Sequence, residues 1–259
     1  MTADPHAPRA VTARLRAGGS VFAEDEAALL IESSTGNDDL ERRIRQRLAG
    51  EPLEYIVGFT EFCGLRVAVT PGVFVPRQRT AFLVGEAVAL ASENAVVVDL
   101  CCGSGALGMA ILDRRPRIRL AAADIEPAAV AIARINLPTA TVTEGDLFEA
   151  LSPELRGTID VLVANTPYVP TGAIALMPPE ARLHEPLSAL DGGADGLDIQ
   201  RRVAAEAPAW LAPGGHLLVE TSAGQAEVSA AIFVAAGLEA RVVVSPEYDA
   251  AIVIATRSS

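Results

Sequence analysis

The sequence predicts an α/β protein whose mostly parallel sheet of seven strands follows a small helical domain. One observation is that, from about residue 80, short β-branched runs alternate with longer helical patterns, as in sheets covered by helices on both faces. Another is that half of the 259 residues are hydrophobic but only 4% are aromatic. A large core built mainly from Ala, Val, Leu and Ile follows.

The first part of the chain divides into two expected units. Residues 1–52 are predicted to form a helical N-terminal domain, because apolar residues recur at helical spacing and glycines interrupt them. Residues 53–75 are predicted to be a β-hairpin linker, because residues 58–72 alternate in polarity around a glycine. The helices of the first unit are expected at 10–18, 23–34 and 38–50.

Residues 76–259 are predicted to form the sheet domain. Only Pro246–Asp249 separate its last two strands, which is too short for a helical crossover, so the final strand should be antiparallel to its neighbour. Strands are expected at 95–100, 119–125, 141–146, 159–165, 214–221, 239–245 and 250–257, and helices at 80–91, 105–113, 126–137, 197–211 and 224–236.

Composition restricts the partners and the compartment. The net charge of -12 and the pI near 4.7 disfavour nucleic acid as a direct substrate, because that binding depends on basic residues. Three cysteines without a CxxC pair indicate a reduced protein. The N-terminus shows no apolar targeting segment, and no run reaches the ~18 residues of a membrane span. We expect a cytoplasmic protein without membrane association.

A small-residue turn follows the first strand of the sheet, within Val96–Ile111. Gly103 and Gly105 allow a ligand to approach the backbone, and Asp99 ends the strand with a carboxylate. Asp124 ends the next strand, where an acid can accept both hydroxyls of a ribose. Asp124 is also well suited to cap the following helix, and both roles are compatible.

The order of these residues favours one cofactor. An acid that precedes the turn would repel a pyrophosphate but suits a ligand with ammonium and sulfonium charges, which indicates S-adenosylmethionine. At the third strand end, Asp146 is predicted to meet the adenine amine, and Leu147 to pack on the ring. A turn cap is the alternative role for Asp146.

Asn165–Tyr168, Asn-Thr-Pro-Tyr, ends the fourth strand beside this cofactor site. The Asn165 side-chain oxygen and the Thr166 carbonyl can accept two hydrogen bonds from a planar NH₂ group, and Tyr168 can pack on its face. Pro167 biases Thr166 toward extended conformations. Because an amide or aryl amine is a poor nucleophile, catalysis should depend on positioning and on carbonyls that stabilise the developing charge.

At this point the chain resembles a known family, the protein-(glutamine-N5) methyltransferases that modify peptide chain release factors. The resemblance implies a class I, Rossmann-like methyltransferase domain that transfers a methyl group from S-adenosylmethionine to a glutamine side chain of a protein acceptor. It also implies that Cys101 and Thr80 border the cofactor. Independently of the resemblance, His6 and His216 have no companions at metal-ligand spacing, so no metal is predicted. The motifs that carry the resemblance are GEPLEYIVG (50–58), EFCGLRVAVTPGVFVPR (61–77), DLCCGSGALG (99–108), NTPY (165–168), EPLSALDGGADGL (185–197) and LAPGGHLLVET (211–221).

Three positions depart from the family pattern. Thr166 replaces a proline, which removes rigidity but keeps the carbonyl. Arg79 replaces an acid near the expected cofactor pocket. Cys101 replaces the first glycine of the turn, and its side chain is expected to exclude a strongly positive φ. The changes indicate a divergent branch, and we expect its acceptor to be a peptide chain release factor or another translation protein.

Ordinary structural roles explain several other features of the sequence. The four arginines of Leu40–Gly50 suit a solvated helix face better than a docking site, and His184 is expected to be a bystander. Asp191–Asp198 lacks the register of a calcium loop, so a loop and helix start explains it better. Trp210 should pack at a helix end.

Two competing functions remain open. The segment Asn165–Tyr168, which we call the acceptor clamp, could also hold the exocyclic amine of adenine. An adenine-N6 methyltransferase on nucleic acid is therefore one alternative, although the acidic charge counts against it. A cofactor-binding interaction module without catalysis is the other, and the intact Asn165, Pro167 and Tyr168 argue against it.

Overall fold

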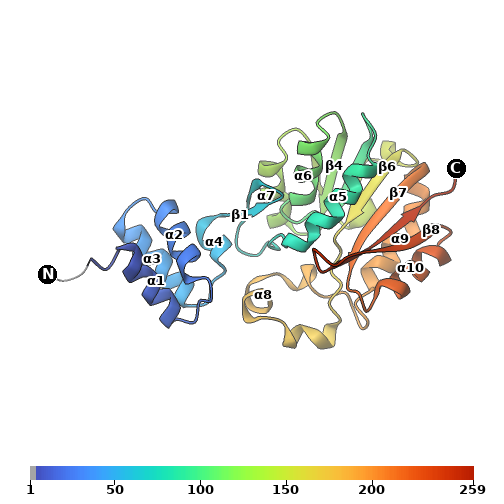
Figure 1. Ribbon diagram of the computed structural model, residues 1–259. Coiled ribbons are helices and arrows are strands. Elements are labelled where there is room, and N and C mark those ends of the chain that lie inside the picture. Colours follow the sequence, from blue (N-terminus) through green and yellow to red (C-terminus); the bar gives the residue numbers. More distant parts are fainter. Residues whose placement is uncertain (1–3) are drawn as a thin grey trace.

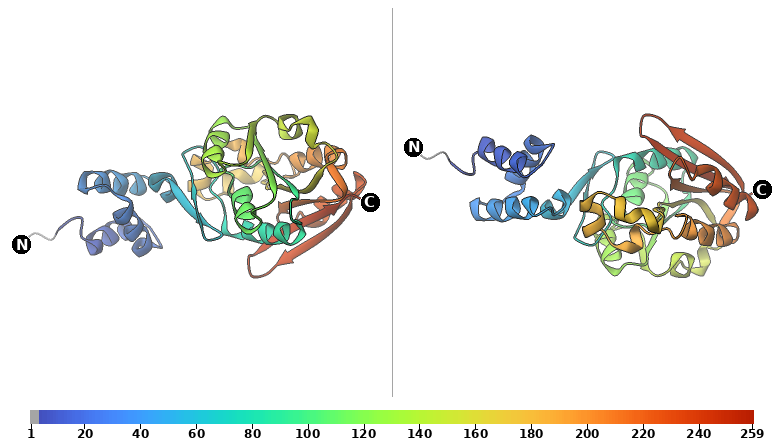
Figure 2. Two further views of the ribbon diagram at one scale, coloured as in Figure 1. Left: turned by 90° about the horizontal axis from the view of Figure 1, so that it is seen from above. Right: turned by 90° about the horizontal axis from the view of Figure 1, so that it is seen from below.

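A computed structural model describes residues 4–259 of the chain, so the first three residues of the predicted domain 1–52 lie outside the described part. Four helices come first and stand to one side of the sheet (Figures 1 and 2). They are α1 (Pro8–Ala17), α2 (Ala23–Ser33), α3 (Asn37–Leu48) and α4 (Leu53–Val57).

The N-terminal helices enclose their own hydrophobic cluster, which includes Leu15, Leu30 and Ile44. Arginines of α3 form ion pairs with acidic residues of the same chain. Arg47 pairs with Glu26, 2.9 Å away, and Arg43 is an ion-pair partner of Asp39 at 3.0 Å. The α3 face is therefore tied together by ion pairs more than it is a free basic surface. The domain boundaries at 52 and 75 stay predictions.

A β-hairpin joins these helices to the sheet. Its strands β1 (Phe59–Phe62) and β2 (Leu65–Ala68) are antiparallel, with Phe62 paired to Leu65 across the turn. Asn136 holds the hairpin against the sheet domain, because its side chain bonds both the N–H and the carbonyl of Ala68, at 3.0 and 2.9 Å.

The seven-stranded sheet has the order β5-β4-β3-β6-β7-β9-β8, and β9 is antiparallel to both of its neighbours, as predicted. The first five strands run parallel, so their carboxyl ends meet at one edge. The bounds are β3 (Val96–Leu100), β4 (Arg119–Asp124), β5 (Thr141–Glu144), β6 (Ile159–Ala164), β7 (Leu211–Thr221), β8 (Glu239–Ser245) and β9 (Ala250–Thr256).

Helices cover both faces of the sheet (Figure 1). Because side chains alternate along a strand, Val97 joins the core under one set of helices, whereas Val96 and Val98 join the core under the other. The first set is α5 (Ala81–Leu90), α6 (Ala106–Arg114) and α7 (Pro127–Asn136), and the second is α9 (Asp198–Trp210) and α10 (Ala226–Ala235). Trp210 ends α9 and stacks on Phe148, with ring centroids 5.4 Å apart, as predicted.

Short helices that were not predicted from the sequence lie within the hairpin linker, directly before α5, between β5 and β6, and between β6 and α9. Each is only three to six residues long, so none completes the periodic pattern by which a helix is recognised. They are α4, α8 (Pro179–His184) and the 3₁₀ helices η1 (Gln78–Thr80), η2 (Leu147–Ala150), η3 (Pro153–Leu155), η4 (Thr171–Leu176) and η5 (Leu187–Ala189).

Candidate active site

A cavity of about 290 Å³ lies at the carboxyl edge of the parallel strands. This volume is at the lower end of the ~300–1,000 Å³ of ligand pockets. Its walls are the segments that follow β3, β4, β5 and β6, and further sides come from residues 72–80 and 186–191. The fold therefore brings together most of the predicted site residues, namely Thr80, Cys101, Gly103, Asp124, Asp146, Leu147, Asn165, Thr166, Pro167 and Tyr168.

The turn after β3 has an unusual backbone. Cys101, Gly103 and Gly105 all have positive φ, at 55°, 54° and 78°. Cys101 contradicts the expectation that its side chain would exclude such a conformation. The turn imposes the left-handed region, and Cys101 accepts a cost of about 1–2 kcal/mol that glycine would not have.

Gly105 is required for packing as well as for conformation. A Cβ atom at this position would lie 2.8 Å from Leu137 Cδ1, so a larger residue would force the Leu137 side chain, at the end of α7, to shift. A Cβ at Gly103 would meet no atom within 4 Å, in keeping with its position in the cavity wall. The two glycines therefore serve different purposes.

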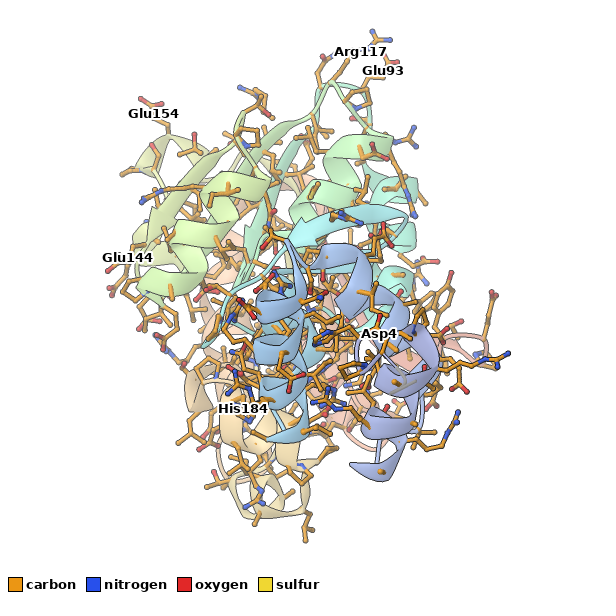
Figure 3. The ribbon with its side chains drawn as sticks, turned by 90° about the vertical axis from the view of Figure 1, so that its left-hand side faces the viewer. Asp4, Glu93, Arg117, Glu144, Glu154 and His184 are labelled. Atoms are coloured by element: carbon orange, nitrogen blue, oxygen red, sulfur yellow. The ribbon has the colours of Figure 1, made fainter. Side chains whose placement is uncertain are left out.

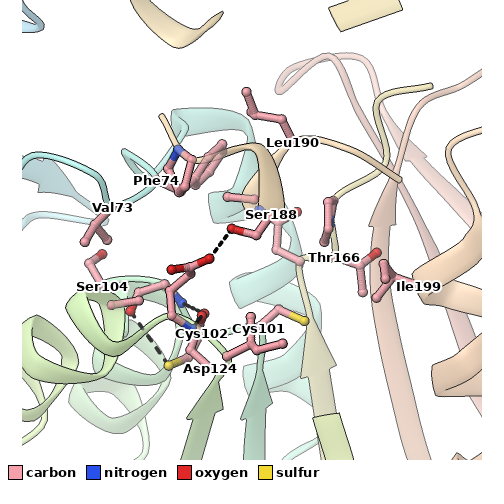
Figure 4. A pocket seen from close by; sticks show the side chains of 18 of the residues that line it. Val73, Phe74, Cys101, Cys102, Ser104, Asp124, Thr166, Ser188, Leu190 and Ile199 are labelled. Carbon is pink, nitrogen blue, oxygen red and sulfur yellow. Dashed lines mark hydrogen bonds between the residues drawn. The ribbon is translucent and has the colours of Figure 1, made fainter. Parts of the chain in front are cut away.

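Asp124 links the turn to the end of β4. Its Oδ2 accepts the Gly103 N–H at 2.8 Å and its Oδ1 accepts the Glu126 N–H at 2.9 Å. Burial raises the pKa of this carboxyl group. The carboxylate also lines the cavity, and each oxygen has a second lone pair, so the local bonds leave it able to accept from a ligand (Figure 4).

Asp99 lies beneath the turn and is absent from the cavity wall. Its side chain is 1% exposed, and Oδ2 accepts the Gly108 N–H at 2.9 Å. Oδ1 has no hydrogen-bond partner among residues 4–259. Burial, with a further contribution from the charge of Asp124, raises the Asp99 pKa to about 7. Its predicted contact with the cofactor has no support in this position.

Asp146 and Leu147 border the cavity at the end of β5. The Asp146 carboxylate accepts a hydrogen bond of 2.7 Å from Arg202 on α9, another cavity residue. Leu147 has a φ of 48° and is nearly buried. Sequence reasoning missed Arg202, because it is 56 residues beyond Asp146 and belongs to an otherwise ordinary helix.

The segment Asn165–Tyr168 leaves β6 at the opposite side of the cavity from the β5 end, since β4 and β3 lie between them in the sheet. Thr166 is 1% exposed, and its hydroxyl has no partner in the described chain. The Tyr168 hydroxyl donates to Glu220 at 3.0 Å and accepts from Arg79 at 2.6 Å. Burial raises the Tyr168 pKa, and the nearby Glu220 raises it further.

Residues 191–198, which we call the glycine loop, pack against the backbone of this segment. The Gly192 N–H donates to the Val169 carbonyl at 2.9 Å. A Cβ on Gly196 would lie 2.3 Å from the Tyr168 carbonyl oxygen, and one on Gly192 would lie 2.7 Å from the Pro167 carbonyl oxygen. The glycine loop therefore packs on the backbone that carries the Tyr168 side chain, a role that no sequence pattern indicated.

Two side-chain contacts hold residues 185–188 beside the cavity. Glu185 is almost fully buried, and its Oε1 accepts from Arg77 at 2.7 Å and from the Val75 N–H at 3.2 Å. Ser188 donates to Glu126 at 2.5 Å across the cavity mouth, the bond marked in Figure 4. Both contacts join residues more than 60 positions apart, which explains why sequence patterns did not reveal them.

Neither metal ligation nor membrane insertion has support in the described residues. No group of three or more His, Cys, Asp or Glu side chains within residues 4–259 is arranged to hold a metal ion. His184 ends α8 and lies outside the cavity wall. Across the same residues, every helix is too short or too polar to cross a bilayer.

Comparison with known proteins identifies the family. The methyltransferase small domain family matches residues 64–181. A release factor glutamine methyltransferase of Geobacter sulfurreducens is 41% identical over 73% of this chain and 67% of its own length. Another, of Mycolicibacterium smegmatis, is 38% identical over 82% of each chain.

A solved structure supports the fold independently. A methyltransferase from Pyrococcus furiosus aligns with a TM-score of 0.57 over 86% of this chain and all of its own, at 13% identity. At that identity the likeness concerns the methyltransferase fold alone. The identities of 41% and 38%, over at least two thirds of each relative, go further. This chain belongs to the family of release factor glutamine methyltransferases.

Proposed function

We propose that this protein transfers a methyl group from S-adenosylmethionine to the side-chain amide nitrogen of a glutamine in a protein acceptor, a peptide chain release factor. The observation that carries this proposal is that Asp124, the turn after β3 and the segment Asn165–Tyr168 all line the same cavity. The cofactor and the acceptor amide would therefore meet in a single space. Membership of the family supports the same reaction.

The cavity residues fit the cofactor chemically. Asp124 and Asp146 bring two carboxylates to the cavity wall. Thr80 and Thr166 belong to the same wall, and their hydroxyls are buried without a partner within residues 4–259. Asp124 would hold the ribose, and Leu147 would pack on the adenine. When bound, S-adenosylmethionine supplies an electrophilic methyl group on a positively charged sulfur.

Asn165 and Thr166 would prepare the acceptor nitrogen. The Asn165 side-chain oxygen and the Thr166 backbone carbonyl accept the two amide N–H groups, and Tyr168 contacts the flat face of the amide. As nitrogen gains positive charge in the transition state, these carbonyl dipoles stabilise it. Because both acceptors would already face the amide nitrogen when it binds, little reorganisation would be needed.

Tyr168 itself is unsuited to remove a proton. Burial and the neighbouring Glu220 raise its pKa above the usual phenol range, so it stays neutral at physiological pH. No histidine of the described chain lines the cavity. A reaction that relies on orientation, with the proton leaving nitrogen after methyl transfer, is consistent with these groups.

The charge of the chain and the contacts of Tyr168 bear on the competing functions. A net charge of -12 disfavours a nucleic acid acceptor, so the adenine-N6 alternative has less support. The glycine-loop contacts that hold Tyr168 in the cavity wall argue against a module without catalysis. A release factor acts in protein synthesis, and we accordingly propose a cytoplasmic enzyme.

Substitution of Asn165 tests the proposed reaction. Asn165→Ala removes one carbonyl acceptor, and by analogy with loss of an oxyanion-hole donor the methylation rate should fall roughly 10²–10³-fold. Asn165→Asp keeps an oxygen acceptor and should retain more activity than Ala. Single-turnover methylation of a release factor, with mass spectrometry to locate the methyl group on glutamine, measures both variants.

The control is cofactor affinity. Calorimetric titration with S-adenosylmethionine should give similar dissociation constants for the wild-type protein and the Ala variant, because Asn165 acts on the acceptor. A near-normal methylation rate for Asn165→Ala would refute the clamp. A wild-type protein that methylates no glutamine of the release factor would refute the proposed function itself.

A further inference from the structure

Three side chains from separate elements meet beside the acceptor clamp. Arg79 comes from η1, Tyr168 follows β6, and Glu220 lies on β7. An Arg79 N–H donates to the Tyr168 hydroxyl at 2.6 Å, and its Nε lies 3.3 Å from Glu220 Oε1. The Tyr168 hydroxyl donates to the same Glu220 oxygen at 3.0 Å. We propose that Arg79 is a positioning residue, which acts through Tyr168 on the acceptor amide.

This inference rests on the proposed function and adds a residue to it. In the family resemblance, an acid usually occupies the position of Arg79, so the basic side chain belongs to this chain's own version of the site. The contacts of Arg79 in this chain therefore determine its role.

Electrostatics make the contact with Glu220 necessary. Glu220 is 2% exposed, and Arg79 is the basic side chain paired with it in the described structure. A buried carboxylate without a cation nearby is strongly unfavourable. Glu220 Oε2 already lacks a partner within residues 4–259. Arg79 therefore helps to hold in place the carboxyl group that accepts the hydrogen bond from the Tyr168 hydroxyl.

Hydrogen bonds hold Tyr168 at its hydroxyl and at its backbone carbonyl. Its hydroxyl lies between Arg79 and Glu220, and its backbone carbonyl accepts from the Gln225 side chain at 3.0 Å. The Arg79 guanidinium also stands 5.9 Å from the ring centroid. A guanidinium offers several N–H donors in a rigid plane, so it can bind two oxygens at once, which a lysine ammonium does with less directional control.

A direct contact between Arg79 and the acceptor is the competing explanation. The Arg79 side chain is 47% exposed and lines the cavity, so it is accessible to a substrate. The two explanations differ in one respect. If Arg79 acts through the Tyr168 hydroxyl, removing that hydroxyl should remove most of the effect of Arg79, whereas a direct contact would persist.

A double-mutant cycle separates these explanations. The variants are Arg79→Ala, Tyr168→Phe and their combination, and the measurement is the kcat and KM for methylation of the release factor. Each single substitution should lower kcat on the order of tenfold, as expected for one hydrogen bond to a charged group. The double variant should be no slower than Tyr168→Phe, and the acceptor KM should change little.

Arg117→Ala provides a matched control. Arg117 forms an exposed ion pair with Glu93 at 3.1 Å, at the end of the molecule far from His184 (Figure 3). It should leave kcat unchanged. A further loss of kcat in the Tyr168→Phe background, a rise in acceptor KM alone, or no effect of Arg79→Ala would each overturn the proposal.

Two additions keep the test decisive. If Arg79→Ala does not fold because Glu220 is left without a cation, Arg79→Lys retains the charge, and it should fold but still lower kcat. In protein labelled with 3-fluorotyrosine, the ¹⁹F resonance absent from Tyr168→Phe identifies Tyr168, and Arg79→Lys should shift that resonance alone. An unshifted Tyr168 resonance would refute the contact, even if the wild-type protein proved inactive on glutamine.

Discussion

Gly196 offers a direct test of how the glycine loop supports the clamp. Its φ of 81° is strained for alanine, and a Cβ there would lie 2.3 Å from the Tyr168 carbonyl oxygen. Ordinary contact begins at 3.4 Å, so the Tyr168 carbonyl and the glycine loop would have to separate by about 1.1 Å, the difference of these distances. A misplacement of about 1 Å can lower a reaction rate ~10²-fold.

Gly157 supplies the matched control for Gly196→Ala. Its φ of 75° imposes nearly the same backbone strain, but a Cβ would meet no atom within 4 Å. Both variants should lose about 1–2 kcal/mol of unfolding free energy from the left-handed conformation. Gly196→Ala should lose more and also lose methylation activity, on the order of tenfold to a hundredfold.

Thermal unfolding and single-turnover methylation measure the two effects separately. For a chain of this size, the shared strain corresponds to a Tm decrease of about 2–8 °C. Gly157→Ala should show that decrease with a normal methylation rate. If Gly196→Ala methylates as fast as Gly157→Ala, the glycine loop does not position Tyr168 and the reasoning is wrong.

Two further predictions concern the turn after β3. Cys101→Gly removes about 1–2 kcal/mol of strain from the folded state. Glycine also gives the unfolded chain more conformational entropy, which lowers the unfolding free energy by about 0.5–1 kcal/mol. The Tm should therefore stay level or rise slightly, and a clear decrease would contradict this. Asp99→Asn tests the raised Asp99 pKa of about 7. Because the folded pKa exceeds the unfolded value, the contribution of Asp99 to stability is full at low pH and is lost as pH rises through 7. The Tm of Asp99→Asn relative to the wild type should therefore increase from pH 5 to pH 8, and parallel Tm profiles would refute this.

The elements that form the sheet could be predicted because their patterns are local. All seven predicted strands are present, and the antiparallel last strand follows from the short connection at Pro246–Asp249. The strand ends also indicated where Asp124 and Asn165 would lie, because parallel strands place their carboxyl ends at one edge. The sequence therefore predicted a large part of the candidate site from topology alone.

The rest of the site depends on contacts that local patterns do not encode. Arg202 meets Asp146 and Arg77 meets Glu185 across 56 and 108 residues, and each pair looks like ordinary surface charge in the sequence. The conformation of Cys101 is the opposite case, since local preference gave the wrong φ. There, the hydrogen bond from Gly103 to Asp124 and the packing of Gly105 on Leu137 determine the turn.

The acids at the strand ends explain why one cavity suits a cationic cofactor. Asp99 lies near the end of β3 and Asp124 ends the neighbouring strand β4. Burial raises the pKa of both carboxyl groups, and repulsion from Asp124 adds to the effect at Asp99. Their ionised forms are therefore unfavourable in the protein alone. Of the two, only Asp124 lines the cavity, so a cation held there would offset the cost at that carboxylate, because an opposite charge favours its ionised form. A pyrophosphate at the same turn would instead increase the repulsion.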